Sequence, residues 1–225
     1  MNYVAEMEQA LFDAVKAGRV DEATRLAREN PALLKARDAN GASPILVAIY
    51  HQKSDVANAL AGLMTLDIFE ASALGNVDRI RELLRQDPSL ASAYAPDGFM
   101  PVGLAAFFGH ADAVKTLIAA GADVNATARN AFKVQPLHAA VAGKNLDIVR
   151  AVLAAGADAN AQQQAGFRPI HEAGSSGRRE LAELLMAHGA DPALTNDAGQ
   201  SSIDLAREKG HTELAQWMSD RSNTG

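Results

Sequence analysis

The sequence predicts an all-α solenoid of stacked helix–turn–helix units joined by hairpin-like loops. Composition favours helices, since the chain of 225 residues holds 47 Ala, the best helix former, and only seven Phe, three Tyr and one Trp, which strands prefer. The chain also repeats itself. Four Pro residues each stand directly before an aliphatic residue and four positions before an Ala: Pro44, Pro101, Pro136 and Pro169.

Weaker copies extend the pattern to seven units. The unit starts are 34, 23, 34, 35, 33 and 33 residues apart. The aliphatic residues are Leu11, Ile45, Ile68, Val102, Leu137, Ile170 and Ile203, and the Ala column is Ala14, Ala48, Ala71, Ala105, Ala140, Ala173 and Ala206. We expect a single array over 1–225, with units at 8–38 (an N-terminal cap), 39–65, 66–96, 97–127, 128–161, 162–195 and 196–219 (a C-terminal cap), and a frayed tail at 220–225.

Each unit predicts a first helix, a turn, a second helix and a polar loop. Pro in the first turn presets φ and gives up no needed hydrogen bond. The aliphatic residue and the Ala share one helix face, and the small Ala indicates that two helices approach closely there. The turn holds Gly18, Gly75, Gly109, Gly177 and Gly210, whereas Gln52 and Lys144 depart from this column. The second helix places one apolar residue per unit in register: Leu26, Leu60, Leu83, Leu117, Val152, Leu185 and Met218.

These features resemble the ankyrin repeat, whose period is about 33 residues. The resemblance covers the chain from about Glu8 to Met218. It implies a binding protein whose His138 and His171 are framework residues bonded to loop backbone. The residues that carry it are Pro136-Leu137-His138, Pro169-Ile170-His171, Gly109-His110, Gly210-His211 and Gly121-Ala122-Asp123-Val124-Asn125-Ala126, the last repeated from Gly156 to Ala161.

Units one and three depart from the Gly-Ala-Asp loop. They carry Asn30-Pro31-Ala32-Leu33-Leu34 and Asp87-Pro88-Ser89-Leu90 in its place. Units two and three start only 23 residues apart, which leaves no room for a hairpin loop. We therefore expect the row of loops to be interrupted between Leu63 and Ile68. A domain boundary there is the alternative, although no linker rich in Gly, Ser or Pro supports it.

Composition and motifs argue against most chemistry. Without Cys the chain has no disulfide, cysteine nucleophile or thiolate zinc site, which fits a reducing compartment. A formal net charge of −6 argues against a nucleic-acid partner. No long apolar run or signal-like start predicts a membrane span or export. No nucleophile–base pair or three-ligand set is organised, so we expect a cytoplasmic protein with no enzyme activity, cofactor or metal.

Two columns that tolerate polar residues point to a binding surface. The positions before the turn Gly hold Phe in one unit, Ser in another and Glu-Lys in a third, so core packing does not require aromatic residues there. The position before each unit start varies similarly. The ankyrin resemblance places both columns on a concave groove. We expect a partner-binding site centred on Phe99, Phe107, Phe108, Val134 and Phe167, with Tyr50, Phe132 and Lys133 at its margin.

Three functions stay open. The first is non-catalytic binding of another protein through the groove, by a monomer. The second is a structural array whose apolar groove binds a second copy, giving a homodimer. The third is a ligand-binding or enzymatic pocket at the irregular junction from Leu63 to Ala71. A competing interpretation of Phe107 and Phe108 packs one of them between the helices of adjacent units, or has these side chains cover the gap left by the missing loop.

Overall fold

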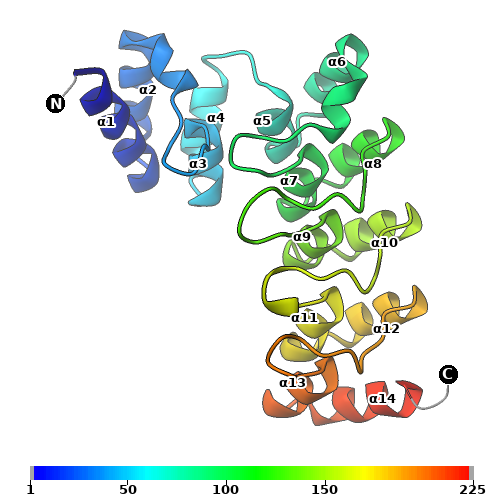
Figure 1. The fold of residues 1–225 in the computed structure, drawn as a ribbon. Helices are drawn as coiled ribbons and strands as arrows, with labels where there is room; N and C mark the ends of the chain where they lie inside the picture. Colours follow the sequence, from blue (N-terminus) through cyan, green and yellow to red (C-terminus); the bar gives the residue numbers. More distant parts are fainter. Residues whose placement is uncertain (1–2, 223–225) are drawn as a thin grey trace.

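The computed structural model describes residues 3–222, in which helices pair off in sequence and the pairs stack on one another (Figure 1). Within this range fourteen α-helices and no β-strand are formed, which confirms the predicted all-α solenoid. The pairs are α1 (Tyr3–Ala17) with α2 (Val20–Glu29), α3 (Pro44–Tyr50) with α4 (Ser54–Ala61), α5 (Ile68–Ala73) with α6 (Val77–Gln86), α7 (Pro101–Phe107) with α8 (Ala111–Ala119), α9 (Pro136–Ala142) with α10 (Leu146–Ala154), α11 (Pro169–Ser176) with α12 (Arg179–Ala187) and α13 (Ser202–Glu208) with α14 (Thr212–Ser222).

The two columns predicted from the sequence form the core that joins neighbouring pairs. All seven column Ala side chains are 0% exposed, and the aliphatic column beside them is at most 8% exposed. Because these side chains are small or well packed, the first helices stack directly, α7 on α9 and α11 on α13. At Gly174 of α11 the approach is so close that a Cβ would overlap the carbonyl oxygen of Ser202.

The turns between paired helices need a left-handed backbone. Gly109 and Gly177 have φ of +83° and +68° there, a region that a Cβ disfavours. Gln52 and Lys144, which depart from the Gly column, adopt the same conformation, each with φ of +58°. The column therefore marks a backbone conformation rather than a residue type, at a cost of about 1–2 kcal/mol for each non-Gly residue.

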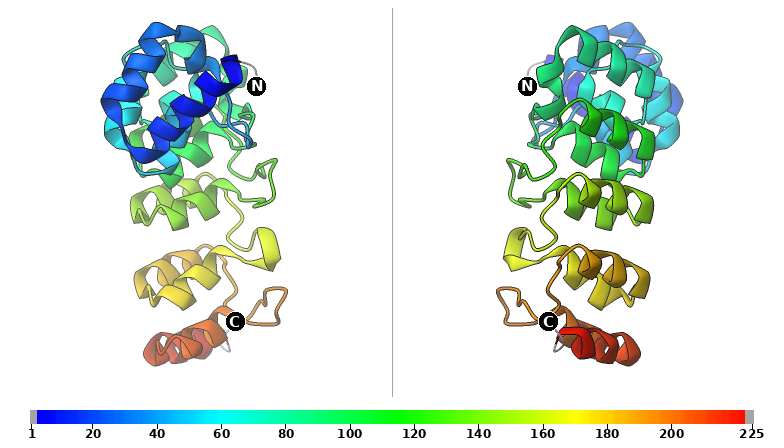
Figure 2. Two further views of the ribbon diagram at one scale, coloured as in Figure 1. Left: turned by 90° about the vertical axis from the view of Figure 1, so that its left-hand side faces the viewer. Right: turned by 90° about the vertical axis from the view of Figure 1, so that its right-hand side faces the viewer.

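The loops project from one edge of the stack and form a row (Figure 2). Backbone hydrogen bonds tie neighbouring loops of the last four pairs together, from Arg129 N–H to Gly98 O (2.9 Å), from Gln164 N–H to Phe132 O (3.0 Å) and from Asp197 N–H to Ala165 O (3.1 Å). These bonds fix the backbone of the row, and with it the side chains that extend from the loops toward the first helices.

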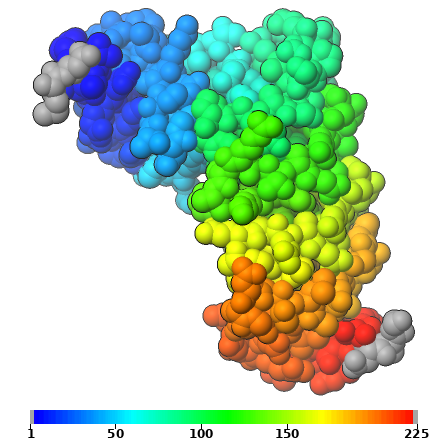
Figure 3. Space-filling view, in the orientation of Figure 1, coloured from blue at the N-terminus to red at the C-terminus, as the bar shows by residue number. Residues whose placement is uncertain are grey.

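The row is interrupted where the sequence predicts. No hairpin loop separates α4 from α5, so loop 36–43 meets loop 93–100 directly, and a Cβ on Gly41 would lie 2.8 Å from the backbone C and O of Pro96. Helices α4 and α6 diverge, and helices α1–α4 extend sideways from the rest of the stack (Figures 1 and 3). One hydrophobic core continues through Leu60, Leu66 and Ile68. This continuity favours one array over a domain boundary.

Short 3-10 helices replace the Gly-Ala-Asp loop after α2 and α6. Asn30 Oδ1 accepts from Ala32 N–H (3.2 Å) at the start of η1 (Pro31–Lys35). Asp87 Oδ1 accepts from Ser89 N–H (3.0 Å) at the start of η2 (Pro88–Ser92). The Asn-Pro and Asp-Pro sequences therefore begin a different local structure, in which the polar side chain caps the new helix.

The frayed tail predicted at 220–225 is wrong in its first part. Helix α14 continues to Ser222, beyond the unit end expected at 219. Two contacts between residues four apart extend it: Gln216 Nε2 donates to Asp220 Oδ1 (2.7 Å), and the Arg221 guanidinium lies 4.5 Å from the centroid of the Trp217 ring. Residues 223–225 lie outside the described part of the chain.

Candidate functional site

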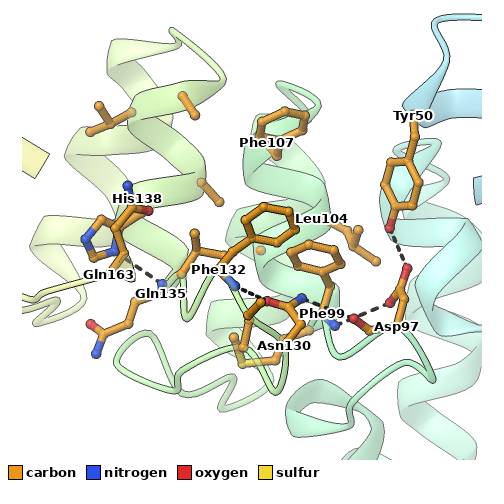
Figure 4. Close-up of a pocket in the computed structure, with 18 of the residues that line it drawn as sticks. Tyr50, Asp97, Phe99, Leu104, Phe107, Asn130, Phe132, Gln135, His138 and Gln163 are labelled. Carbon is orange, nitrogen blue, oxygen red and sulfur yellow. Dashed lines mark hydrogen bonds between the residues drawn. The ribbon is translucent and has the colours of Figure 1, made fainter. Parts of the chain in front are cut away.

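An apolar hollow lies between the row of loops and the first helices (Figure 4). Its volume is about 920 Å³, and it is lined from α3, α7, α9 and α11 and from the loops that precede them. The third pair contributes no residue to it. Six aromatic side chains line the hollow and define what we call the aromatic groove: Tyr50, Phe99, Phe107, Phe108, Phe132 and Phe167.

Five of the aromatic rings contact one another in a chain across the groove. The centroid of Tyr50 lies 6.3 Å from that of Phe99 and 6.0 Å from that of Phe108. Phe132 lies 6.5 Å from Phe99 with the ring planes 16° apart, and Phe107 meets Phe108 edge-on at 5.0 Å. Offset and edge-on contacts of this kind fix ring orientations, so the apolar surface exists before any partner binds.

Two of these rings are unusually exposed for Phe. Phe107 is 48% exposed and Phe132 is 57% exposed. Tyr50, Phe99 and Phe108 are half-buried and pack against the core. The competing interpretation therefore holds in part: Phe108 packs against the core while Phe107 does not, and the contacts among Tyr50, Phe99 and Phe108 cross the place of the missing loop.

Phe132 reaches the groove because its loop is two residues longer than the others. In the loops before α3, α7, α11 and α13, the closing backbone bond joins residues four apart, whereas before α9 it runs from Ala128 N–H to Val134 O. Asn130 occupies the extended tip, where its Oδ1 accepts from Phe132 N–H (3.2 Å) and its Nδ2 donates to Asp97 O (3.1 Å). These bonds hold the longer loop, and with it the Phe132 ring, at the groove.

The hollow depends on Gly103 of α7. The equivalent positions of the next two pairs hold His138 and His171, whose imidazoles are buried. A Cβ on Gly103 would meet nothing within 4 Å. The groove is therefore open at a place where a larger side chain would close it.

His138 and His171 serve the framework, as the resemblance implies. His138 Nδ1 accepts from Gln135 N–H (3.2 Å), and its Nε2–H donates to Ala161 O (3.1 Å). His171 Nδ1 accepts from Arg168 N–H (2.9 Å). Burial lowers the pKa of His138 to about 4 and lowers the pKa of His171 as well. Both imidazoles are therefore neutral at pH 7 and bond to backbone groups.

One end of the groove is acidic. Tyr50 Oη donates to Asp97 Oδ2 (2.7 Å), and Asp97 Oδ1 accepts at longer range from Phe99 N–H (3.4 Å). Asp97 is only 8% exposed, although it lines the hollow. Burial, and next the charge of Asp97, raise the pKa of Tyr50 far above its usual value. The phenol therefore stays protonated and remains a donor to Asp97.

Seven of the eight residues predicted for the site line the groove: Tyr50, Phe99, Phe107, Phe108, Phe132, Val134 and Phe167. The eighth, Lys133, is exposed beside Phe132 but is not among the lining residues. Sequence reasoning missed Asp97, Gly103 and Asn130. The 35-residue spacing that ends at α9 was a signal for the long loop, and Gly103 in the column of His138 was a signal for the open space.

The acidic residues at the junction from Leu63 to Ala71 form a helix cap. Asp67 Oδ1 accepts from Phe69 N–H and Glu70 N–H, each at 2.9 Å, and Glu70 Oε2 accepts in return from Asp67 N–H (3.1 Å). Glu70 is 1% exposed, and burial raises its pKa. This reciprocal bonding starts α5 and gives both side chains a structural role.

Two further features of the described residues bear on other functions. Residues 3–222 contain no group of three His, Cys, Asp or Glu placed to hold a metal ion. Within the same range, each helix is too short or too polar to cross a bilayer.

Comparison with known families gives one match. The family model described as ankyrin repeats, in three copies, matches residues 68–163 and again residues 137–224. The two matches together span more than half of the chain and include every part of the groove except α3 and the loop before it. No curated protein sequence matches the chain significantly.

Proposed function

The chain belongs to the ankyrin-repeat family, and from this premise we propose that it is a non-catalytic module of the cytoplasm that binds a partner protein in the aromatic groove as a monomer. Ankyrin repeats are generally protein–protein interaction modules. The proposal adds the surface, which runs from Tyr50 of the second pair to Phe167 of the sixth.

The observation that carries the proposal is the exposure of Phe107 and Phe132 beside a preformed hollow. The large hydrophobic side chains exposed in residues 3–222 are Tyr3, Val4, Phe107 and Phe132, and the last two line the groove. An exposed aromatic cluster around a concave apolar surface is typical of interface hot spots, where one aromatic side chain contributes about 2 kcal/mol or more. Neither ring is needed to fill the core, so recognition is the better explanation of both.

The test fills the groove without disturbing the core. Gly103→Leu places a side chain in the hollow, where a Cβ meets nothing. We expect it to abolish capture of partner proteins from a native lysate while the melting temperature stays equal or rises. Gly103→Ala adds only a methyl group at the same site and should retain capture.

A second pair of variants removes the exposed rings. Phe107→Ala/Phe132→Ala should lose the same captured proteins, whereas Tyr3→Ala, which removes a 71% exposed aromatic residue from α1, should not. Capture that survives both Gly103→Leu and the double Phe variant would place the interface on another face. A dimer in sedimentation without any partner, dissociated by Phe132→Ala, would favour the self-associating array.

A further inference from the structure

We propose that the aromatic groove selects a partner segment that carries an Arg or Lys side chain among apolar residues, with the cationic group received beside Asp97. This inference rests on the proposed function and adds the chemistry of the partner to it. Figure 4 shows the arrangement: Tyr50 and Asp97 stand at one end of the hollow, the Phe rings occupy its middle, and His138 stands at the other end.

The charges that line the groove are unbalanced. Asp38, Asp97 and Glu172 line it, against Arg168 alone. Arg168 is occupied, because its Nη1 donates to Thr195 O (2.6 Å) in the next loop. His138 adds no positive charge at pH 7, since burial lowers its pKa to about 4. The field inside the groove therefore favours a cation and opposes an acidic segment or a phosphate backbone.

Asp97 is the focus of this field. It is 8% exposed, and in residues 3–222 it forms no ion pair with Lys, Arg or His. The Tyr50 hydroxyl stabilises the carboxylate by a hydrogen bond but carries no charge to offset it. A carboxylate removed from water gains most from a cation that approaches in the same low-dielectric surroundings. Asp97 therefore places in the lining of the groove a negative charge that has no ion-pair partner among the described residues.

The rings next to Asp97 suit the rest of a basic side chain. The ring centroids of Phe99 and Phe108 lie 6.3 Å and 6.0 Å from the centroid of Tyr50. Their faces attract a guanidinium or ammonium group through the ring quadrupole, and they pack against the methylene stem that leads to it. The same end thus combines a carboxylate, aromatic faces and apolar depth, which is the chemistry that recognises Arg or Lys.

The two ends of the groove differ in charge, which sets the direction of the segment. Asp38 and Asp97 both raise the pKa of Tyr50, so both charges act at the end formed by α3 and loop 93–100. At the other end Glu172 is accompanied by Arg168. We expect the basic residue to sit at the Tyr50 end and apolar residues to extend along Phe132 and Phe167.

A random peptide display library, selected on the immobilised full-length protein, tests the inference. Peptides enriched over the Gly103→Leu protein as background should be rich in Arg and Lys flanked by apolar residues. For the best peptide, replacing the basic residue by a neutral isostere (citrulline for Arg, norleucine for Lys) should raise Kd about tenfold, the effect of one desolvated charged contact. The comparison of the peptide with its isostere uses only the unaltered protein and is measured by fluorescence anisotropy.

Asp97→Asn locates the contact. The amide oxygen can accept from Phe99 N–H while the amide nitrogen donates to Tyr50 Oη, so the variant should melt close to the temperature of the unaltered protein, yet the isostere replacement should now change Kd less than about twofold. Asp112→Asn removes an equal charge from an 83% exposed side chain on α8 and should keep the full preference.

The other outcomes each overturn a defined part. Apolar peptides enriched without Arg or Lys would refute the inference and leave the proposed function standing. A basic preference that persists in Asp97→Asn would refute the assignment to this carboxylate. No enrichment over the Gly103→Leu background would remove the groove as a peptide site altogether. A dimer that Asp97→Asn dissociates would show that a second copy is the occupant.

Discussion

Two junctions between loops, one regular and one irregular, differ in what their polar groups do. At the regular junction, loop 126–135 meets loop 160–168, and His138 donates to Ala161 O (3.1 Å) while Gln164 N–H donates to Phe132 O (3.0 Å). At the irregular junction, loop 36–43 meets loop 93–100 across the third pair, which has no loop of its own. There Leu46 and Gly103 occupy the column of His138, and the loops touch through Gly41 and Pro96.

The comparison shows how a departure from a repeat creates a site. In the regular junction each framework side chain fills the space between helix and loop and satisfies a neighbouring backbone group. At the irregular junction Leu46 and Gly103 stand in the His column, and neither side chain can bond to a backbone group. The space stays open beside Gly103, and Tyr50 reaches Asp97 of the loop two pairs away. The short spacing between units two and three brings loops 36–43 and 93–100 together. Gly103, which stands where the next two pairs have a His, leaves the volume of the hollow open.

The substitution with the largest expected effect disrupts the contact between loops 36–43 and 93–100. Gly41→Ala would place a Cβ 2.8 Å from the Pro96 backbone at a φ of +92°. We expect it to lower the free energy of unfolding by about 3 kcal/mol, from backbone strain and overlap together, and to weaken groove binding because Asp97 shifts with its loop. Chemical denaturation measures the loss.

Gly199→Ala is the matched control for this substitution. Gly199 occupies the same turn position with φ of +77°, but a Cβ there meets nothing within 4 Å. It should cost about 1–2 kcal/mol, the strain alone. Equal losses in both variants would mean that the contact between loops 36–43 and 93–100 contributes nothing.

The next effect concerns the regular junction and pH. The pKa of His138 is about 4 in the folded protein because of burial, against an ordinary value of 6.5. Between these values the unfolded chain binds the proton more readily than the folded chain does. The free energy of unfolding therefore keeps its full value above pH 6.5 and declines toward pH 4 as the unfolded chain binds the proton, by on the order of 3 kcal/mol in all.

Denaturation curves at pH 7, 6, 5 and 4 measure this decline. His138→Gln, which has no titrating group, should show a shallower slope over that range. An NMR titration that finds the His138 ring protonated near pH 6.5 would contradict the burial argument directly.

The sequence predicts the regular region well because its columns repeat. The Ala column, the left-handed turn and the His framework each recur in several units, so one unit checks another. The same logic identified six of the seven predicted groove residues, all but Phe132, since Phe107 and Phe108, for example, stand in columns that accept Ser or Glu elsewhere. The structure places these seven around one hollow, while their role in binding stays a prediction.

The residues that sequence reasoning missed are brought together by contacts between units. A comparison of equivalent positions in the repeats does not reveal such contacts. Asp97 looks like an ordinary loop residue, because it stands directly before the turn Gly98 as Asn40 stands before Gly41. Only the meeting of loops 36–43 and 93–100 brings it to Tyr50. The end of α14 was missed for a different reason: the polar residues after Met218 resemble a tail, and their helical contacts run between side chains four apart.

The smallest expected effect sharpens the comparison at a single methyl group. Gly103→Ala should raise the free energy of unfolding by about 0.5–1 kcal/mol, because Ala is the better helix former and its Cβ meets nothing in the irregular region. Gly174→Ala, in the equivalent helix of a regular pair, should lower stability by about 1–3 kcal/mol because its Cβ overlaps Ser202 O. Thermal and urea denaturation of both variants measure the two signs. A loss of stability in Gly103→Ala would show that the space beside Gly103 is filled in solution. That result would contradict the open hollow at this position.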